Sequence, residues 1–190
     1  MVLDYMIGST ETEWIHMTSG NRALNSKGEI IMDDRQFRNA MGKFATGVNV
    51  IAAEVEGEVY GMTANAFMSV SLDPKLIVIS IGDQAKMLDR IRQSGRFSVN
   101  VLSCEQQEES MRFAGQKEFE DQFEFDRLGE APVIKDALCQ LSCEVYNEHT
   151  EGDHVLFIGK VNDLVLKEGE PLIFNCGKYR RLEALEAVAK

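Results

Sequence analysis

The sequence contains no apolar run long enough to form a membrane-spanning helix, which takes about 20 consecutive apolar residues. Its first residues also lack the basic start and apolar middle of a secretory signal, so we expect a cytoplasmic location. There is no internal repeat, low-complexity tract or linker. The 190 residues, of which 44% are hydrophobic and 27% charged, predict one well-buried globular domain.

Positive charge is scarce. The chain has 20 Lys and Arg residues against 31 Asp and Glu residues, which gives a formal net charge of -11. This balance argues against nucleic acid and against an anionic membrane surface as partners, because both bind basic faces. A small anionic ligand is compatible with it, since local backbone N–H groups and a few cations can outweigh the global field.

Cysteine is rare and is not arranged to bind metal. The four cysteines, Cys104, Cys139, Cys143 and Cys176, form no CxxC pair and have no histidine at a zinc-like spacing. We therefore expect structural thiols and no metal site. The P-loop, GxSxG, HExxH and Gly-rich dinucleotide motifs are absent too, so a nucleotide cofactor would have to bind without a Rossmann fold.

What the sequence does contain is a series of short β-type runs with a few helical segments. A helix is expected to begin at Asp33 or Asp34 and to stop at Thr46-Gly47, and the run Leu76–Ile81 is typical of a strand buried on both faces. These patterns predict a mainly antiparallel barrel or sandwich with flanking helices. The other expected elements are strands over 48–55, 97–102, 138–147, 154–166 and 171–175, a strand running towards Gly61, helices over 84–93 and 105–114, and a charged loop over 115–131.

The most informative segment is Gly61–Pro74, in which small and hydroxyl-bearing residues alternate with large apolar ones. Thr63, Asn65 and Ser69 offer donors and acceptors, and the small neighbours let a flat ligand approach the backbone. The alternative is an ordinary strand with polar edges and a turn marked by proline. That alternative accounts poorly for Thr63-Ala64-Asn65, because Asn and small residues are weak strand formers.

Two further clusters contain residues that could bind a ligand. His154, in Gly152-Asp153-His154 at the start of an expected strand, can hydrogen-bond a carbonyl or amide of a ligand or stack on a ring. The alternative is a turn histidine that hydrogen-bonds only to the neighbouring backbone. The basic and aromatic run Cys176–Arg181 can meet phosphates while Tyr179 stacks, or it can be a solvated strand edge. Lys86 and Arg90 lie four apart on an expected helix and would face the same way.

Residues 1–31 differ from the rest, with no sustained period. Codons for Lys27-Gly28-Glu29 can spell a ribosome-binding site, and Met32 follows at a fitting distance. The hypothesis is that the natural protein starts at Met32 and that residues 1–31 are an extension that is not native. It places the functional domain at 32–182 and a tail at 183–190.

Several short segments, taken together in chain order, resemble the flavin reductase family. They are Phe37–Val48, Gly61–Asn65, Ser71–Pro74, Ser94–Leu102, Phe113–Gly115 and Gly152–His154. The similarity covers residues 32 to about 182. Within the family, Ala85–Leu88 and Pro132–Leu138 are most similar to the small reductase component of two-component phenol or 4-hydroxyphenylacetate hydroxylases.

The resemblance implies a flavin-binding split β-barrel, a homodimer, and NAD(P)H-dependent reduction of FAD or FMN for a separate flavin-dependent monooxygenase that receives the reduced flavin by diffusion. The residues that it assigns to the flavin are Thr63, Ala64, Asn65, Ala66, Phe67, Gln84, Ala85, Lys86, Arg90, Ile91 and Gln116. Those that it assigns to the nicotinamide groove are Ser69, Val70, His154, Gly177, Lys178, Tyr179 and Arg180.

Hydride transfer from nicotinamide to flavin needs stacking and orientation rather than an acid–base pair, so His154 is expected to position the nicotinamide. Many relatives have Ser where this chain has Ala66 and Ala85, which favours FAD over FMN, with Lys86 as a phosphate partner. The acidic chain favours NADH over NADPH. The alternatives are a flavin-binding electron carrier or sensor without turnover, and a barrel protein that binds no flavin.

Overall fold

The computed structural model describes residues 16–17, 23–24 and 27–183 of the chain. The hypothesis about residues 1–31 and the expected tail therefore fall largely outside the described residues. The chain divides into two compact units, Met1–Phe44 and Ala45–Lys190. The described part of the first unit contains α1 (Asp34–Met41) and a three-stranded antiparallel sheet of β1 (His16–Met17), β2 (Ala23–Leu24) and β3 (Ile30–Ile31).

The helix α1 begins as expected and ends early. Asp33 caps it, because its side chain accepts a hydrogen bond from the Arg35 amide at 3.1 Å. The expected helix up to Thr46-Gly47 is wrong: α1 ends at Met41, next to Gly42, and Thr46–Gly47 forms the short strand β4. Glycine is a poor helix former, which accounts for the early end.

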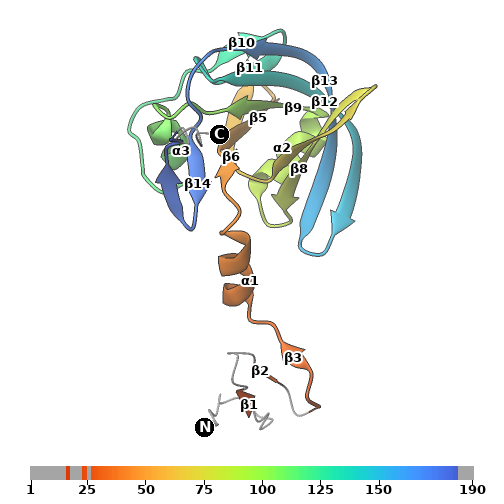
Figure 1. The fold of residues 1–190 in the computed structure, drawn as a ribbon. Coiled ribbons are helices and arrows are strands. Elements are labelled where there is room, and N and C mark those ends of the chain that lie inside the picture. The colour runs from red at the N-terminus through yellow and green to blue at the C-terminus, as the bar shows by residue number, and fades with distance from the viewer. Residues whose placement is uncertain (1–15, 18–22, 25–26, 184–190) are drawn as a thin grey trace, which may run out of the picture. The chain divides into compact units, whose positions relative to one another are not determined.

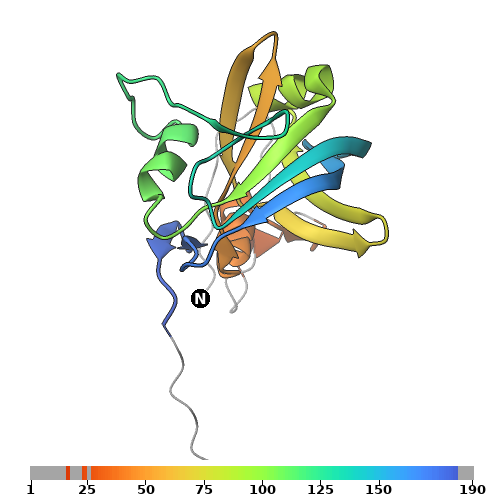
Figure 2. The ribbon, with the colours of Figure 1, turned by 90° about the horizontal axis from the view of Figure 1, so that it is seen from above.

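The second unit is built on one seven-stranded antiparallel sheet, in the order β6-β5-β9-β12-β13-β8-β7. Its two edge strands, β6 and β7, follow each other in the chain with only Asn65-Ala66 between them. Because two residues cannot span the width of a flat sheet, the sheet must curl until its edges meet, as Figures 1 and 2 show. The strands are β5 (Asn49–Val55), β6 (Glu58–Ala64), β7 (Phe67–Leu72), β8 (Lys75–Gly82), β9 (Arg96–Val101), β12 (Cys139–Glu151) and β13 (His154–Leu166).

The inner face of the curled sheet holds the main core. Ile51, Ile79, Phe97 and Phe157 are completely buried there. The helix α2 (Lys86–Ser94) closes this core with Met87, Leu88 and Ile91, the three residues expected to face inward, and it ends at Gly95, whose φ of 66° is left-handed. The prediction of a mainly β fold with flanking helices is confirmed.

The strand β8 differs from its prediction. Ile77, Ile79 and Ile81 are buried, whereas the intervening Leu76 and Val78 are only half-buried. The expectation of burial on both faces is therefore wrong for the chain as described. An antiparallel sheet can pack one face on the core and leave the other open, and the apolar Leu76 and Val78 on the open face made this alternation undetectable in the sequence.

A second, smaller core lies around Val50, Leu102, Ile134 and Leu172. The helix α3 (Gln107–Phe113) packs on β6 with Phe113, which forms an aromatic cluster with Phe123 and Phe125. A three-stranded sheet in the order β15-β14-β4 completes this side, with β4 (Thr46–Gly47), β14 (Ile173–Asn175) and β15 (Lys178–Arg180).

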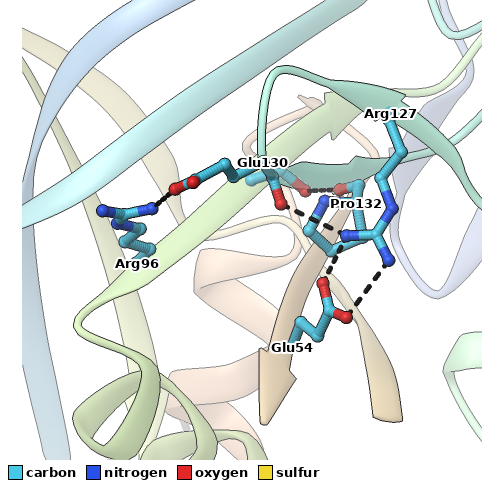
Figure 3. A network of polar contacts seen from close by, with 6 residues as sticks. Glu54, Arg96, Arg127, Glu130 and Pro132 are labelled. Carbon is cyan, nitrogen blue, oxygen red and sulfur yellow. Dashed lines mark hydrogen bonds and ion pairs between the residues drawn. The ribbon is translucent and has the colours of Figure 1, made fainter. Parts of the chain in front are cut away.

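The expected charged loop over 115–131 is partly wrong, because its end forms a hairpin of β10 (Asp126–Leu128) and β11 (Ala131–Val133). Charged contacts link this hairpin to the sheet, as Figure 3 shows, and the residues of β11 are buried. Arg127 binds both carboxylate oxygens of Glu54 on β5, and Arg96 on β9 binds Glu130. Charged residues that suggested a loop therefore help to attach the hairpin to the sheet.

No helix in the described residues is both long and apolar enough to cross a membrane. The same part of the chain holds no group of three or more His, Cys, Asp or Glu side chains that could share a metal ion.

Candidate functional site

The connection between β6 and β7 interrupts the strand pattern where small residues predicted a ligand-binding backbone. Gly61 to Ala64 and Phe67 to Leu72 are strands, and Asn65-Ala66 belongs to neither. The carbonyl of Asn65 accepts from the Phe67 amide at 3.0 Å, and that of Ala66 accepts from the Ser80 amide at 3.1 Å. The N–H groups of Asn65 and Ala66 donate to no other described residue, which leaves two donors for a ligand.

A cavity of about 140 Å³ opens beside this connection. It brings together four residues expected to bind the flavin and one expected to border the nicotinamide groove. These are Thr63, Ala64, Asn65 and Gln116 for the flavin and Tyr179 for the groove. Val48, Ser110, Ala114 and Phe174 complete the wall. Residues from β6, α3 and the β14–β15 hairpin thus meet around one space, although 116 residues of sequence separate Thr63 from Tyr179.

Neutral hydroxyl groups connect the walls of this cavity. The Thr63 Oγ1 donates to the backbone carbonyl of Ser110 at 2.7 Å. The Ser110 Oγ lies 2.8 Å from the Tyr179 hydroxyl, and either oxygen can be the donor. Both contacts are hydrogen bonds of ordinary length, so β6, α3 and β15 are linked through one residue.

An aromatic row lies on the same side of the small sheet. Phe174 is the cross-strand partner of both Thr46 on β4 and Tyr179 on β15, and such partners point to one face. The Phe174 and Tyr179 rings meet edge to face, with centroids 5.5 Å apart. The Thr46 Oγ1 in this row is buried and has no hydrogen-bond partner among the described residues, a group that a ligand or water would satisfy.

A second group of expected site residues lies at the end of β8. His154 begins β13 opposite Gly82, and its Nε2 is 3.8 Å from where a Cβ on Gly82 would lie. Its Nδ1 is 2.8 Å from the Asp153 carboxylate. The turn after Gly82 leads through Gln84 and Ala85 into α2, so His154 lies beside the segment expected to hold the flavin phosphate.

The N-terminus of α2 carries no side-chain cap on Ala85, and Lys86 is exposed at its first position. Free N–H groups and a cation at a helix N-terminus are suited to an anion. Arg90 is engaged elsewhere, because its guanidinium lies 3.9 Å from the centre of the Tyr60 ring. The side chain of Ile91 is completely buried in the core, which leaves only its backbone for a ligand.

The remaining expected residues do not line the 140 Å³ cavity. Ala66 is exposed in the β6–β7 connection, and Phe67 on β7 packs partly against the main core. Ser69 and Val70 are exposed on β7, where the pairing with β8 is irregular. The last group is exposed around the turn of the β14–β15 hairpin and comprises Gly177, Lys178 and Arg180.

The four cysteines are free thiols. Cys143 is buried in the main core, and desolvation raises the pKa of its thiol to about 12. Burial also raises the pKa of Cys139, while a hydrogen bond to Glu105 raises that of Cys104. These three groups stay protonated at neutral pH, as expected for structural thiols.

Sequence reasoning missed Val48, Ser110, Ala114 and Phe174 as cavity residues. Ser110 had a detectable signal. It lies four residues after Gln106 and three before Phe113, so it shares the buried face of an amphipathic helix. A small hydroxyl on a buried face needs a hydrogen-bond partner, which marks it for attention.

Comparisons with known proteins agree with this arrangement. Residues 41–183 match the flavin reductase like domain. The chain is 43% identical over 151 residues to an NADH-dependent flavin reductase from Rhodococcus sp, covering 78% of this chain and 86% of that protein. It is 37% identical over 147 residues to the reductase component of 4-hydroxyphenylacetate 3-monooxygenase from Thermus thermophilus, covering 77% and 95%.

The solved structure of the flavin reductase PheA2 in its native state superposes with a TM-score of 0.79 at 59% sequence identity. The match covers 80% of this chain and 100% of that one. The shared fold confirms the expected split barrel, and the matched residues include both groups of site residues described above. The chain therefore belongs to the flavin reductase like domain family.

Proposed function

We propose that this protein is an NADH:flavin oxidoreductase, which transfers a hydride from the nicotinamide of NADH to a flavin and supplies the reduced flavin to a separate aromatic monooxygenase. The observation that carries the proposal is the cavity in which Thr63, Asn65 and Gln116 meet Tyr179. Relatives support it, since they include NADH-dependent flavin reductases and a reductase component of an aromatic monooxygenase.

The residues present fit a flavin. The N–H groups of Asn65 and Ala66 and the Thr46 hydroxyl are donors without a partner among the described residues, as an edge of amide and carbonyl groups requires. Ala64 and Ala114 offer small apolar surface for a flat ring, and the start of α2 with Lys86 suits a phosphate. A bound flavin supplies the ring system that accepts the hydride.

The protein's own part in this chemistry is binding and orientation. The backbone donors at Asn65-Ala66 fix one edge of the ring, and Tyr179 borders the space in which the nicotinamide would stack. His154 serves as the positioning residue for the nicotinamide. The Asp153 carboxylate holds the imidazole by its Nδ1, which leaves Nε2 as the group that faces a ligand.

The protein acts as a homodimer. The outer face of the sheet carries an apolar cross-strand row of Met68, Val78 and Ile158, of which Met68 is 61% exposed. Val78 and Ile158 are half-buried, and a row of accessible apolar side chains on a sheet face supports an interaction site there. The cavity of about 140 Å³ is also smaller than the roughly 300 Å³ at the low end of ligand pockets. A single copy therefore forms only part of a pocket, and a second copy would supply the remaining wall.

FAD is the preferred flavin in this proposal, because Ala66 and Ala85 lack the hydroxyls that favour FMN and Lys86 takes the phosphate contact. One relative is named as an NADH-dependent FAD reductase from Streptomyces globisporus, and another as an NADH-dependent FMN reductase from Streptomyces nodosus.

The free state of all four cysteines supports a cytoplasmic location.

Anaerobic rapid mixing tests the proposal. Protein loaded with FAD is mixed with NADH, and loss of the visible flavin absorbance within the first turnovers is the expected result. An unchanged spectrum would identify a carrier or sensor instead, and a colourless protein that no added flavin stabilises would exclude flavin binding. Steady-state rates with FAD or FMN and with NADH or NADPH then rank the four combinations.

A further inference from the structure

We propose that Ser110 is a positioning residue that fixes Tyr179 across the cavity and thereby sets the affinity for the nicotinamide. The inference rests on the proposed function, because it needs a nicotinamide to bind beside Tyr179. Sequence motifs did not single out Ser110, and its role follows from its contacts.

Ser110 is completely buried, yet both of its polar ends reach residues that line the cavity. Its carbonyl accepts from Thr63 at 2.7 Å, and its Oγ is 2.8 Å from the Tyr179 hydroxyl. Thr63 belongs to the wall expected to hold the flavin and Tyr179 to the groove expected to hold the nicotinamide. One residue therefore sets the spacing between the two walls.

The helix that carries Ser110 is held firmly. Phe113, one turn later, packs against Gly61 so closely that a Cβ there would lie 2.4 Å from the Phe113 ring. Its ring also contacts Phe123 and Phe125, with centroids 5.0 Å and 5.5 Å away. The position of Ser110 relative to β6 is fixed by this packing.

The hairpin that carries Tyr179 is held more weakly. Its strands β14 and β15 have three residues each, and β15 is the edge of its small sheet. The Tyr179 side chain is anchored by the ring contact with Phe174 and by the hydroxyl of Ser110. Figure 1 shows α3 beside this hairpin. Loss of the hydroxyl contact would free one end of the ring to move.

The expected effect is specific for the nicotinamide. In Ser110→Ala, Tyr179 keeps its strand and its Phe174 contact but loses its hydroxyl partner. The KM for NADH should rise about fivefold, as for the loss of one neutral hydrogen bond, with kcat changed less than about twofold. The dissociation constant of FAD, measured by fluorescence titration without NADH, should change less than the KM for NADH.

A double-mutant cycle tests whether the effect passes through this one bond. Ser110→Ala, Tyr179→Phe and the double variant are compared in KM for NADH and in NAD⁺ affinity by calorimetry. The expected result is that each single variant has nearly the full effect and that the double variant is no worse. Independent, multiplying effects would overturn the inference, as would an unchanged KM in Ser110→Ala.

Ser98→Ala is the matched control, because Ser98 is also a completely buried serine with hydrogen bonds, but on β9 away from the cavity. It should lower the thermal unfolding midpoint without raising the KM for NADH. If Ser110→Ala does not fold, Tyr179→Phe removes the other hydroxyl of the same hydrogen bond, at a residue that is only half-buried. A wild-type protein that NADH does not reduce refutes the proposed function itself, whereas an active wild type with an unaffected Ser110→Ala refutes only this inference.

Discussion

At the scale of single residues, the site consists of groups that orient rather than groups that transfer protons. The Thr63 hydroxyl donates to the Ser110 carbonyl, the Ser110 hydroxyl contacts that of Tyr179, and the Nδ1 of His154 lies 2.8 Å from the Asp153 carboxylate. Hydride transfer gains from such fixed geometry, because a well-placed donor and acceptor react without further ordering.

His154→Ala should raise the apparent KM for NADH about tenfold, as expected for one lost hydrogen bond to a polar ligand group, while FAD affinity falls less. Steady-state kinetics and flavin titration measure the two effects. His149→Ala is the control, because His149 is an exposed histidine on β12 that contacts Asn147, whereas His154 lies opposite Gly82 at the turn into α2. Unchanged NADH kinetics in His154→Ala would remove this residue from the site.

Some of the residues that line the cavity could be predicted from the sequence, and others could not. Thr63 and Asn65, which line the cavity, could be selected from the sequence because small or polar residues that interrupt a strand pattern need another explanation. Phe174 and Val48 could not, since an aromatic and an apolar residue in a strand look the same whether they line a cavity or a core. Only the tertiary structure separates these two cases.

At the scale of elements, the placement of α3 depends on one glycine. Gly61 leaves room for the Phe113 ring, which Phe123 and Phe125 hold on its other sides. Glycine here serves a close approach between a helix and a strand, which is a common reason for glycine inside a strand.

Gly61→Ala should therefore lower the free energy of unfolding by about 1–3 kcal/mol, the usual cost of an overpacked core, and should weaken FAD binding through displacement of α3. Urea denaturation and flavin titration measure these effects. Gly57→Ala is an unsuitable control because its φ of 84° is strained, whereas a Cβ at Gly47 meets nothing within 4 Å. Gly47→Ala should be the milder change, and equal losses in both variants would contradict the steric argument.

An ion pair between Arg127 and Glu54 connects the β10–β11 hairpin to β5. The bidentate contact with the Arg127 guanidinium lowers the pKa of Glu54 below its usual value and raises that of Arg127. A carboxylate with a lowered pKa in the folded state stabilises the fold above its unfolded pKa of about 4.3, and this contribution is lost as pH falls through the lowered folded value.

Arg127→Met should then lower the free energy of unfolding at about pH 7 by less than about 1 kcal/mol, because both side chains are partly solvated. The difference from wild type should shrink at an acidic pH below the lowered pKa of folded Glu54, where this carboxyl is protonated in both folded and unfolded chains. Urea denaturation at the two pH values is the measurement. With Glu54→Gln in the background, Arg127→Met should show no such pH dependence, and a difference that persists there would point to lost packing instead.

Element types were largely predictable, and element ends were not. The helix of Met87, Leu88 and Ile91 and the strands around Val50 and Phe157 followed from periodicity. The β10–β11 hairpin escaped detection because its contacts are with residues distant in sequence, among them Glu54 and Ser98, and its short strands carry no clear pattern of their own.

At the scale of the whole molecule, the curled sheet has two faces with different roles. Its inner face holds the core, and its outer face over β7, β8 and β13 carries Met68, Val78 and Ile158 in one row. The sequence suggested a strand buried on both sides at Leu76–Ile81, and a single copy buries only one. A second copy on the outer face would reconcile the apolar composition of β8 with its exposure.

Val78→Lys tests this. Val78 is at the centre of the row, between Met68 on β7 and Ile158 on β13, and its side chain lies outside the core. The monomer should therefore keep its fold, while an ammonium buried between two copies should weaken the proposed dimer by about a hundredfold or more. Sedimentation equilibrium measures the association and circular dichroism the fold.

Leu182→Lys introduces the same charge at another exposed apolar position, 57% exposed, and should leave the dimer intact. FAD affinity provides a second readout. If the partner copy completes the 140 Å³ cavity, flavin binding should fall together with dimer formation and recover at protein concentrations that restore the dimer. A wild-type protein that sediments as a monomer while it binds FAD tightly would show that one copy holds the flavin alone.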